Sequence, residues 1–239
     1  MSQVDYKTVE LPSGAKLYVH EAKPCNGMAV VACPGGGFRQ VNVDKEGHLL
    51  APWFNEQGIT LAVLDYRMPA GQPELPRQDM REALATIRVL DGVRKVGAMG
   101  MSIGGYYAAA ASTFLDLKER PDFQILLYSM VSLTDELTLV PLREKIVATG
   151  VTEADAEKYS PEKHVDEYSP TAFIATCEDD PAVNPLNSTT YFSALKKAGV
   201  KAELHIYPYG KHGFATAEDF PFRTELLTAV GRFISELPE

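Results

Sequence analysis

The sequence predicts an α/β protein with a mostly parallel central sheet, helices on both faces of the sheet and a short helical insertion. Strand-like segments that are apolar at nearly every position alternate with segments of helical spacing, which is typical of a sheet buried on both faces. The 239 residues suit a single domain with a sizeable core. The alternation breaks once, at about residues 130–170, where we expect a short cap-like insertion into the domain at 1–239.

The predicted strands and helices follow one another along the chain. Residues 15–20 alternate like an outer strand, whereas residues 59–66 form the continuous apolar run of a buried strand. The other predicted strands are the start of 27–37 and residues 95–101, 123–129, 171–177 and 201–208. The predicted helices are residues 46–57, 77–90, 104–115, 187–199 and 222–237.

Charge and composition exclude several classes of partner. The formal net charge is −9 and no Lys/Arg run occurs, so nothing predicts binding to nucleic acid or to an anionic membrane. No segment is apolar for the length of a membrane span, and the N-terminus has no basic and apolar signal-peptide pattern. We expect a soluble protein, cytoplasmic as the sequence stands, or secreted or periplasmic if a signal peptide has been removed. The oligomeric state stays open.

The three cysteines do not predict a disulfide framework or a zinc site. They are Cys25, Cys33 and Cys177, an odd number without a CxxC pair. Cys33 and Cys177 end apolar runs and are expected to be small core residues.

One motif lies where a predicted strand gives way to a predicted helix. Residues 100–104 read Gly-Met-Ser-Ile-Gly, which is a G-x-S-x-G. Between a strand and a helix this motif is typical of a nucleophile on a sharp, strained turn, and its glycines let the two elements approach closely. The alternative is a plain glycine-rich turn. The context favours Ser102 as a nucleophile, beside a helix N-terminus that favours negative charge on a substrate oxygen.

A serine nucleophile needs a base that takes its proton. His212 lies in a glycine-flanked loop after the last predicted strand, where a base would reach a nucleophile that follows a middle strand. The remaining histidines lie in predicted strands, at a predicted helix start or in the insertion: His20, His48, His164 and His205. We therefore expect His212 to be the base, although a surface loop alone would also explain it.

The base in turn needs a carboxylate that orients it. The loop after residues 171–177 offers Glu178, Asp179 and Asp180, and at most one of them can point at the imidazole. The other acids of this loop are expected to be solvated or to cap a helix. The chain order serine, acid, histidine is the order that G-x-S-x-G enzymes use.

A glycine-rich loop follows an early strand. Residues 32–40 read ACPGGGFRQ, and successive glycines let backbone N–H groups approach a ligand closely. No lysine follows as a phosphate-binding P-loop requires. We expect the N–H groups of Gly36 and Gly37, with that of Ile103, to form an oxyanion hole.

These four features together make the chain similar to a known family. It resembles α/β-hydrolase serine esterases of the acetylxylan esterase and carbohydrate acetyl esterase type, which are related to the hormone-sensitive-lipase group. The resemblance spans about residues 29–214, which is most of the chain. It is carried by CPGGGF, LDYRMP, DMREALATIRVL, GAMGMSIGGYYAA, LLYSMVSLTD and residues 169–214.

The resemblance implies an eight-stranded α/β-hydrolase fold and a carboxylic ester hydrolase that needs neither metal nor cofactor. It implies Ser102 as nucleophile and His212 as base. In the family the acid comes three residues before the valine of a V-P pair, which selects Asp180 here. This chain has Asn184 between Val183 and the proline, so Asp179 stays an alternative.

Departures from the family pattern bear on the substrate. Cysteine and proline replace the histidine before the glycines, and Ile103, where many relatives have a small residue, would narrow the acyl pocket. The insertion is short and rich in charge, unlike a lid for lipid chains. We expect removal of a small acyl group, acetyl foremost, from a polar alcohol such as a small-molecule or oligosaccharide ester.

Three alternatives to this function stay open. A feruloyl esterase needs an aromatic slot, and Phe38, Trp53, Tyr106, Tyr107 and Tyr209 could supply one, although packing explains most of them. A peptidase of the same fold would usually show an added domain or a site that reads a charged terminus. A non-catalytic binding protein on a hydrolase scaffold would be expected to have lost part of the triad.

Overall fold

The fold is built on one twisted eight-stranded sheet. The computed structural model describes residues 5–134, 136–138 and 140–238. The described strands run in the order β1-β2-β4-β3-β5-β6-β7-β8. Their bounds are β1 (Lys7–Glu10), β2 (Lys16–His20), β3 (Met28–Cys33), β4 (Thr60–Asp65), β5 (Lys95–Met101), β6 (Phe123–Leu127), β7 (Thr171–Cys177) and β8 (Ala202–Tyr207).

The six strands β3 to β8 run parallel to one another. At one edge of the sheet, β2 pairs antiparallel with both β4 and β1. The predicted fold class, α/β with a mostly parallel sheet, is therefore confirmed. In parallel sheets the carboxyl ends of the strands meet at one edge, and ligands bind there. The segments after β3, β5, β7 and β8 carry the residues singled out in the sequence, so the topology collects them at this edge.

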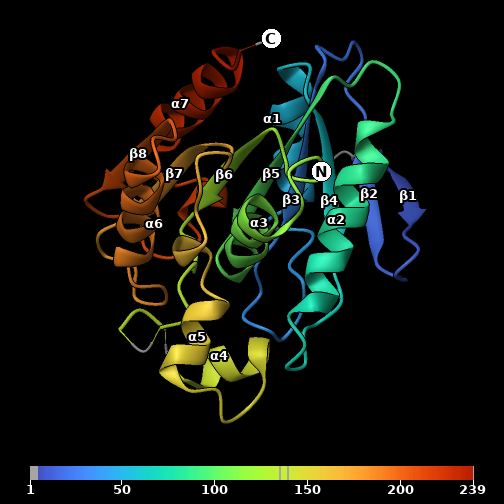
Figure 1. Ribbon diagram of the computed structural model, residues 1–239. Coiled ribbons are helices and arrows are strands. Elements are labelled where there is room, and N and C mark those ends of the chain that lie inside the picture. The colour runs from blue at the N-terminus through green and yellow to red at the C-terminus, as the bar shows by residue number, and fades with distance from the viewer. Residues whose placement is uncertain (1–4, 135, 139, 239) are drawn as a thin grey trace.

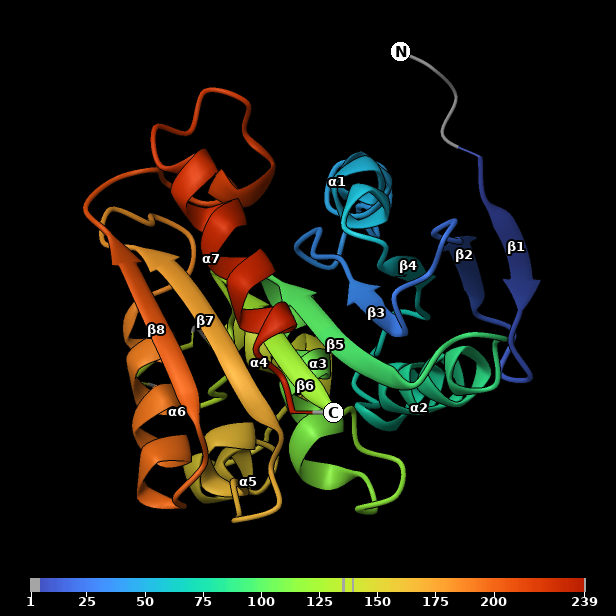
Figure 2. The ribbon, with the colours of Figure 1, turned by 90° about the horizontal axis from the view of Figure 1, so that it is seen from above.

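Helices cover both faces of the sheet (Figures 1 and 2). On one face lie α2 (Glu74–Arg88), α3 (Ile103–Phe114) and α6 (Leu186–Lys197), and on the other lie α1 (Ala51–Glu56) and α7 (Arg223–Ser235). Buried side chains such as Met80 and Tyr107 fill the first layer, and Phe54 and Phe233 fill the second. Two apolar layers explain why the inner strands are apolar at nearly every position.

In the described residues of the segment expected as an insertion, the chain forms two short helices and a 3₁₀ turn. These are α4 (Val140–Val147), α5 (Glu153–Lys158) and η2 (Pro161–Lys163). Figure 1 shows α4 and α5 together at the lower end of the ribbon, beyond the sheet. Arg143 of α4 is buried and pairs with Glu153 of α5 at 3.1 Å, which ties the two helices together.

Two local predictions differ from the structure. Residues 46–57 form not one helix but a loop, the 3₁₀ turn η1 (His48–Leu50) and the six-residue α1. Pro52 fits only the first turn of a helix, so α1 begins beside it. The short edge strand β1 was not predicted from the sequence. No described helix is both long enough and apolar enough to cross a membrane.

Candidate active site

Ser102 occupies the sharp turn between β5 and α3. Its φ of 54° and ψ of −126° lie in a region that residues with a side chain rarely adopt. The Ser102 N–H donates to Leu127 O at 3.2 Å, and its carbonyl accepts from the N–H of Met130 at 3.0 Å. Hydrogen bonds to the last residue of β6 and to the segment after it therefore hold the strained turn, on which the half-buried Ser102 lies.

Two glycines let α3 begin directly against the sheet. A Cβ on Gly104 would lie 2.0 Å from the carbonyl oxygen of Cys33, and a Cβ on Gly105 would lie 2.0 Å from Ser129 Oγ. No side chain fits at either position without moving the backbone. The glycines after the serine therefore have a steric cause, which is the close approach of helix and strands.

The structure brings Ser102, His212 and Asp180 into one hydrogen-bonded chain. His212 Nε2 lies 2.8 Å from Ser102 Oγ, and His212 Nδ1 lies 2.8 Å from Asp180 Oδ2. Because an ionised carboxylate only accepts hydrogen bonds, Nδ1 carries the ring proton and Nε2 is left to accept from the serine hydroxyl. This is the tautomer that a general base needs.

Asp180 is held in its charged form. Its side chain is fully buried, which opposes ionisation, but Oδ1 accepts from the N–H groups of Ala182 at 2.8 Å and Val183 at 3.0 Å. These bonds and the one from His212 outweigh burial and lower the pKa of Asp180 below its usual value. The carboxylate is therefore ionised at neutral pH.

Asp179 has a different set of contacts. Its Oδ1 accepts from the N–H groups of Gly210 and Lys211 at 2.9 Å and 2.8 Å. Asp179 thus holds the backbone of the loop that carries His212, whereas the ring of His212 bonds to Asp180. Of the two aspartates left open by the sequence, the geometry favours Asp180 as the partner of the imidazole.

The glycine loop faces the same cavity as the serine. Gly36, Gly37 and Ile103 line this cavity together with Ser102 and His212. Within the described part of the chain, the N–H groups of Gly36, Gly37 and Ile103 donate to no acceptor. Free N–H groups at a helix N-terminus and a glycine loop suit an anionic oxygen.

The cavity at Ser102 has a volume of about 360 Å³. Its apolar wall is formed by Phe38, Ile103, Met130, Leu142 and Val183, of which Leu142 comes from α4 of the insertion. Its polar lining includes Asn42, Lys45 and Glu46.

Of the aromatic residues considered for a feruloyl slot, only Phe38 lines the described cavity. Tyr106 and Tyr107 are buried in the core layer around α3. The partly buried Trp53 packs against the core on the opposite face of the sheet. The side chain of Tyr209 is exposed and packs on Phe222.

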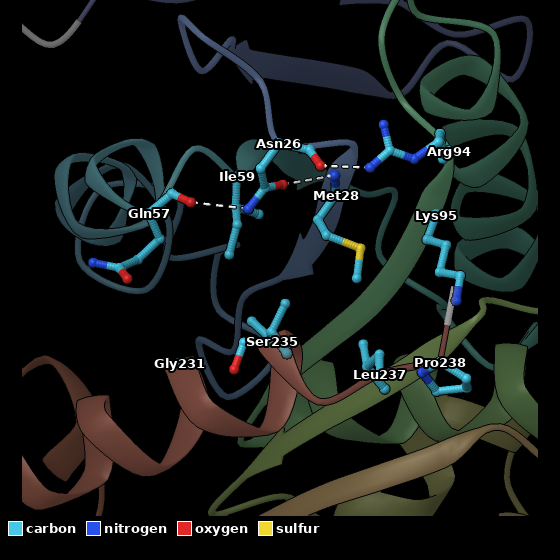
Figure 3. A pocket seen from close by; sticks show the side chains of 11 residues that line it. Asn26, Met28, Gln57, Ile59, Arg94, Lys95, Gly231, Ser235, Leu237 and Pro238 are labelled. Carbon is cyan, nitrogen blue, oxygen red and sulfur yellow. Dashed lines mark hydrogen bonds between the residues drawn. The ribbon is translucent and has the colours of Figure 1, made fainter.

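A larger cavity of about 710 Å³ lies at the other end of the sheet (Figure 3). Lys95, which lines it, is the first residue of β5, whereas Ser102 follows the last residue of the same strand. The side chain of Asn26 links two other residues of the lining, because it donates to Gln57 O at 2.9 Å and accepts from the N–H of Met28 at 2.9 Å. This cavity is therefore separate from the serine.

The described residues contain no cluster of three or more His, Cys, Asp or Glu side chains that could hold a metal ion. His20 and His48 pair with each other at 2.8 Å, and His205 stacks on Phe173. His164 packs against Phe114. Within the part of the chain that the structure describes, His212 is thus the only histidine that meets the serine.

Sequence reasoning missed two side chains at this site. Glu46 lines the cavity and is buried, and the fully buried Tyr128 stacks edge-to-face on His212 with ring centroids 4.9 Å apart. Tyr128 lies in LLYSMVSLTD, which contributes to the family resemblance but gives this tyrosine no role, and Glu46 lies in residues 46–57, where the sequence predicts a helix. A glutamate beside a glycine, shortly after the glycine loop, was the available signal.

The fold and this arrangement of side chains are those of the α/β-hydrolase class. Within that class the chain belongs to the Prolyl oligopeptidase family, which its residues 78–229 match.

The chain is similar to two curated proteins that are named for activity on xylan. The chain is 31% identical over 229 residues to an acetylxylan esterase of Xylanibacter ruminicola, a match covering 89% of this chain and 46% of that protein. It is 26% identical over 211 residues to endo-1,4-beta-xylanase B of Butyrivibrio fibrisolvens, covering 80% and 33%. The chain thus spans less than half the length of these curated relatives.

Among solved structures, an acetyl ester-xyloside bifunctional hydrolase from Caldicellulosiruptor lactoaceticus superposes with a TM-score of 0.84. The two chains are 26% identical, and the match covers 94% of this chain and 88% of that one. The resemblance to acetylxylan esterases expected from the motifs is therefore confirmed.

Proposed function

We propose that this protein is a serine carboxylesterase that removes small acyl groups, acetyl foremost, from a carbohydrate or a similar polar alcohol. The observation that carries the proposal is the hydrogen-bonded chain from Asp180 through His212 to Ser102, with both ring nitrogens at 2.8 Å from their partners. The similarity to an acetylxylan esterase supports the choice of substrate.

The first half of the reaction forms an acyl-enzyme. Ser102 Oγ attacks the ester carbonyl carbon while His212 Nε2 takes the hydroxyl proton. Asp180 holds the ring tautomer and stabilises the imidazolium. The carbonyl oxygen becomes an oxyanion, which accepts from the N–H groups of Ile103 and the glycine loop. Loss of one such donor typically lowers the rate by about 10²–10³-fold.

The second half releases the acid. The C–O bond to the alcohol breaks as His212 passes its proton to the leaving oxygen. A water molecule then attacks the acyl-enzyme while His212 takes its proton, and Ser102 leaves with that proton restored. Acetate and the free sugar hydroxyl are the products, and neither a metal nor a cofactor takes part.

The cavity supports a small acyl group. Ile103, Leu142 and Met130 form an apolar wall in a cavity of only about 360 Å³. The polar groups of Asn42 and Lys45 in the same lining suit hydroxyl groups of a sugar. We include in this proposal that the insertion at 130–170 acts as a short cap, because it supplies both Leu142 and Met130.

Peptide hydrolysis is the second candidate function. The match of residues 78–229 to the Prolyl oligopeptidase family favours it, and the same acyl-enzyme chemistry cleaves amides. The two candidates differ in the leaving group that His212 must protonate.

Hydrolysis of p-nitrophenyl esters of rising acyl length tests the proposal, with Ser102→Ala as the inactive variant. Ser235→Ala is the matched control, because Ser235 lines the cavity at the far end of the sheet. We expect acetate to be preferred, and acetylated xylo-oligosaccharides to release acetate only with an intact Ser102. Aminoacyl p-nitroanilides test the peptidase alternative. Absence of Ser102-dependent turnover on every ester would contradict the esterase.

A fluorophosphonate probe separates an enzyme from a binding protein on the same scaffold. Such a probe reacts only with an activated serine, so we expect labelling that disappears in Ser102→Ala. An unlabelled wild-type protein would favour the binding role.

A further inference from the structure

Glu46 is a buried carboxylate that the proposed reaction does not use. Only 6% of its surface is exposed, although it lines the cavity at Ser102. In the part of the chain that the structure describes, no Lys, Arg or His forms an ion pair with it. A buried charge without a counter-ion is unfavourable unless hydrogen bonds satisfy it. The hydrogen-bond partners of the Glu46 carboxylate therefore indicate its role in the site.

One oxygen holds the glycine loop. Glu46 Oε2 accepts from the N–H of Gly35 at 2.6 Å. The position is crowded, since a Cβ on Gly35 would lie 2.7 Å from the Cβ of Ser102 and 2.8 Å from that same Oε2. The carboxylate, the first glycine of the loop and the serine thus lie in direct contact around one point. Any movement of Glu46 would move the loop that carries Gly36 and Gly37.

The other oxygen holds a tyrosine that packs on the base. Glu46 Oε1 accepts from the hydroxyl of Tyr128 at 3.0 Å. The ring of Tyr128 contacts His212 edge-to-face at 4.9 Å and Phe214 at 5.1 Å, measured between centroids. Burial and the neighbouring Glu46 raise the pKa of Tyr128, so its hydroxyl stays protonated and able to donate.

The backbone places Glu46 in this position. Its N–H donates to Asn42 O at 3.0 Å, and the N–H of Asn42 donates to Gly35 O at 2.9 Å. Hydrogen bonds thus run from the backbone of Glu46 through Asn42 to Gly35, whose N–H donates to the side chain of Glu46. This closed ring of hydrogen bonds makes the loop and the carboxylate one unit.

We propose that Glu46 is a positioning residue for acyl transfer. Its two oxygens hold the N–H of Gly35 and the O–H of Tyr128, and through them fix the oxyanion loop and the ring of His212 relative to Ser102. A carboxylate suits this role because both of its oxygens only accept, as two facing donors require. The inference rests on the proposed function, since it assigns a role in the reaction of Ser102.

Three variants separate this role from plain packing. Glu46→Met keeps the length of the side chain but removes both acceptors. Glu46→Gln keeps an acceptor for Gly35, and Tyr128 can turn its hydroxyl to accept from the new amide. Glu162→Met is the matched control, because Glu162 is another buried glutamate, at 8% exposure, and does not line the cavity at Ser102.

The first measurement is the rate of labelling by a fluorophosphonate, which needs the activated serine and the oxyanion hole but no natural substrate. We expect Glu46→Met to label about 10- to 100-fold more slowly than wild type, with kcat for p-nitrophenyl acetate lowered similarly and KM unchanged. Glu46→Gln is expected to restore labelling to within about threefold, and Glu162→Met to label like wild type. If Glu46→Met does not fold, Tyr128→Phe, which removes one oxygen atom, takes its place with an expected loss of about tenfold.

The outcomes distinguish the two proposals. Wild-type labelling at Ser102 with equally fast labelling of Glu46→Met and Tyr128→Phe overturns the role of Glu46 and leaves the esterase standing. An equal loss in Glu46→Met and Glu46→Gln overturns the acceptor role. Absence of labelling in wild type overturns the proposed function and this inference with it.

Discussion

The two neighbouring aspartates after β7 differ in what they bind, and this difference yields a sharp prediction. Asp180 accepts the Nδ1–H of His212, whereas Asp179 accepts two backbone N–H groups of the loop that carries His212. Changing each to asparagine removes one negative charge at nearly constant volume. Only the change at Asp180 alters what the imidazole can do.

The expected magnitudes follow from these contacts. In Asp180→Asn an amide replaces the carboxylate 2.8 Å from Nδ1, which permits the wrong ring tautomer and no longer stabilises the imidazolium. In serine hydrolases this change lowers kcat by about 10⁴-fold, or about 5.5 kcal/mol of transition-state stabilisation. In Asp179→Asn the side-chain oxygen still accepts from both N–H groups, so we expect kcat to fall less than about tenfold.

The assay is steady-state hydrolysis of p-nitrophenyl acetate by both variants and wild type at neutral pH. Thermal unfolding of each variant serves as the control for folding. A loss in Asp179→Asn as large as that in Asp180→Asn would refute the assignment, and so would an Asp180→Asn variant that keeps more than a tenth of the wild-type kcat.

Other predictions concern stability and acyl selectivity. Burial, with a smaller contribution from the neighbouring His48, lowers the pKa of His20 to about 4. As pH falls below about 6.5, His20 therefore binds a proton in the unfolded chain before it does so in the folded protein, and this favours unfolding. Between pH 6.5 and 4, the free energy of unfolding from urea titrations should therefore fall by about 2 kcal/mol more in wild type than in His20→Gln. Gly231→Ala in α7 should raise the free energy of unfolding by about 0.5–1 kcal/mol, because the new Cβ would lie 3.7 Å from its nearest neighbour. Gly104→Ala should instead lower Tm strongly, because its Cβ would lie 2.0 Å from a carbonyl oxygen. Leu142→Ala should raise kcat/KM for butyrate relative to acetate about tenfold, and an unchanged ratio would place the acyl group elsewhere.

Much of the fold was predictable because burial on both faces leaves a direct trace in the sequence. The bounds predicted for the strands at Lys95–Met101 and Thr171–Cys177 match the structure to the residue, since each is a mostly apolar run that no charged residue interrupts after its first position. The edge strand Lys7–Glu10 carries no such trace because its four residues are exposed or half-buried. Its register comes from pairing with β2, which no local pattern encodes.

The candidate site was predictable where a residue follows the end of a strand. Ser102 directly follows β5, and His212 lies in the loop after β8. Because parallel topology brings the carboxyl ends of the strands to one edge of the sheet, these two residues lie close together. The choice between Asp179 and Asp180 was not decided by residue type, because both are aspartates in one turn. It is decided by which donors, some 30 residues further along the chain, the fold brings to each carboxylate.

In the sequence, only the neighbouring Gly47 and the nearby glycine loop point to Glu46, because residues 46–57 predict a helix and a glutamate on a helix is usually solvated. Its role depends on Gly35 and Tyr128, which are 11 and 82 residues away. A negative charge in this cavity would by itself oppose the oxyanion that forms on the substrate. Two donors, one on each oxygen, hold the carboxylate in place against the loop and the tyrosine. Position, rather than charge, is then what the site gains from Glu46, and this is the reason that a neutral glutamine is expected to serve and a methionine is not.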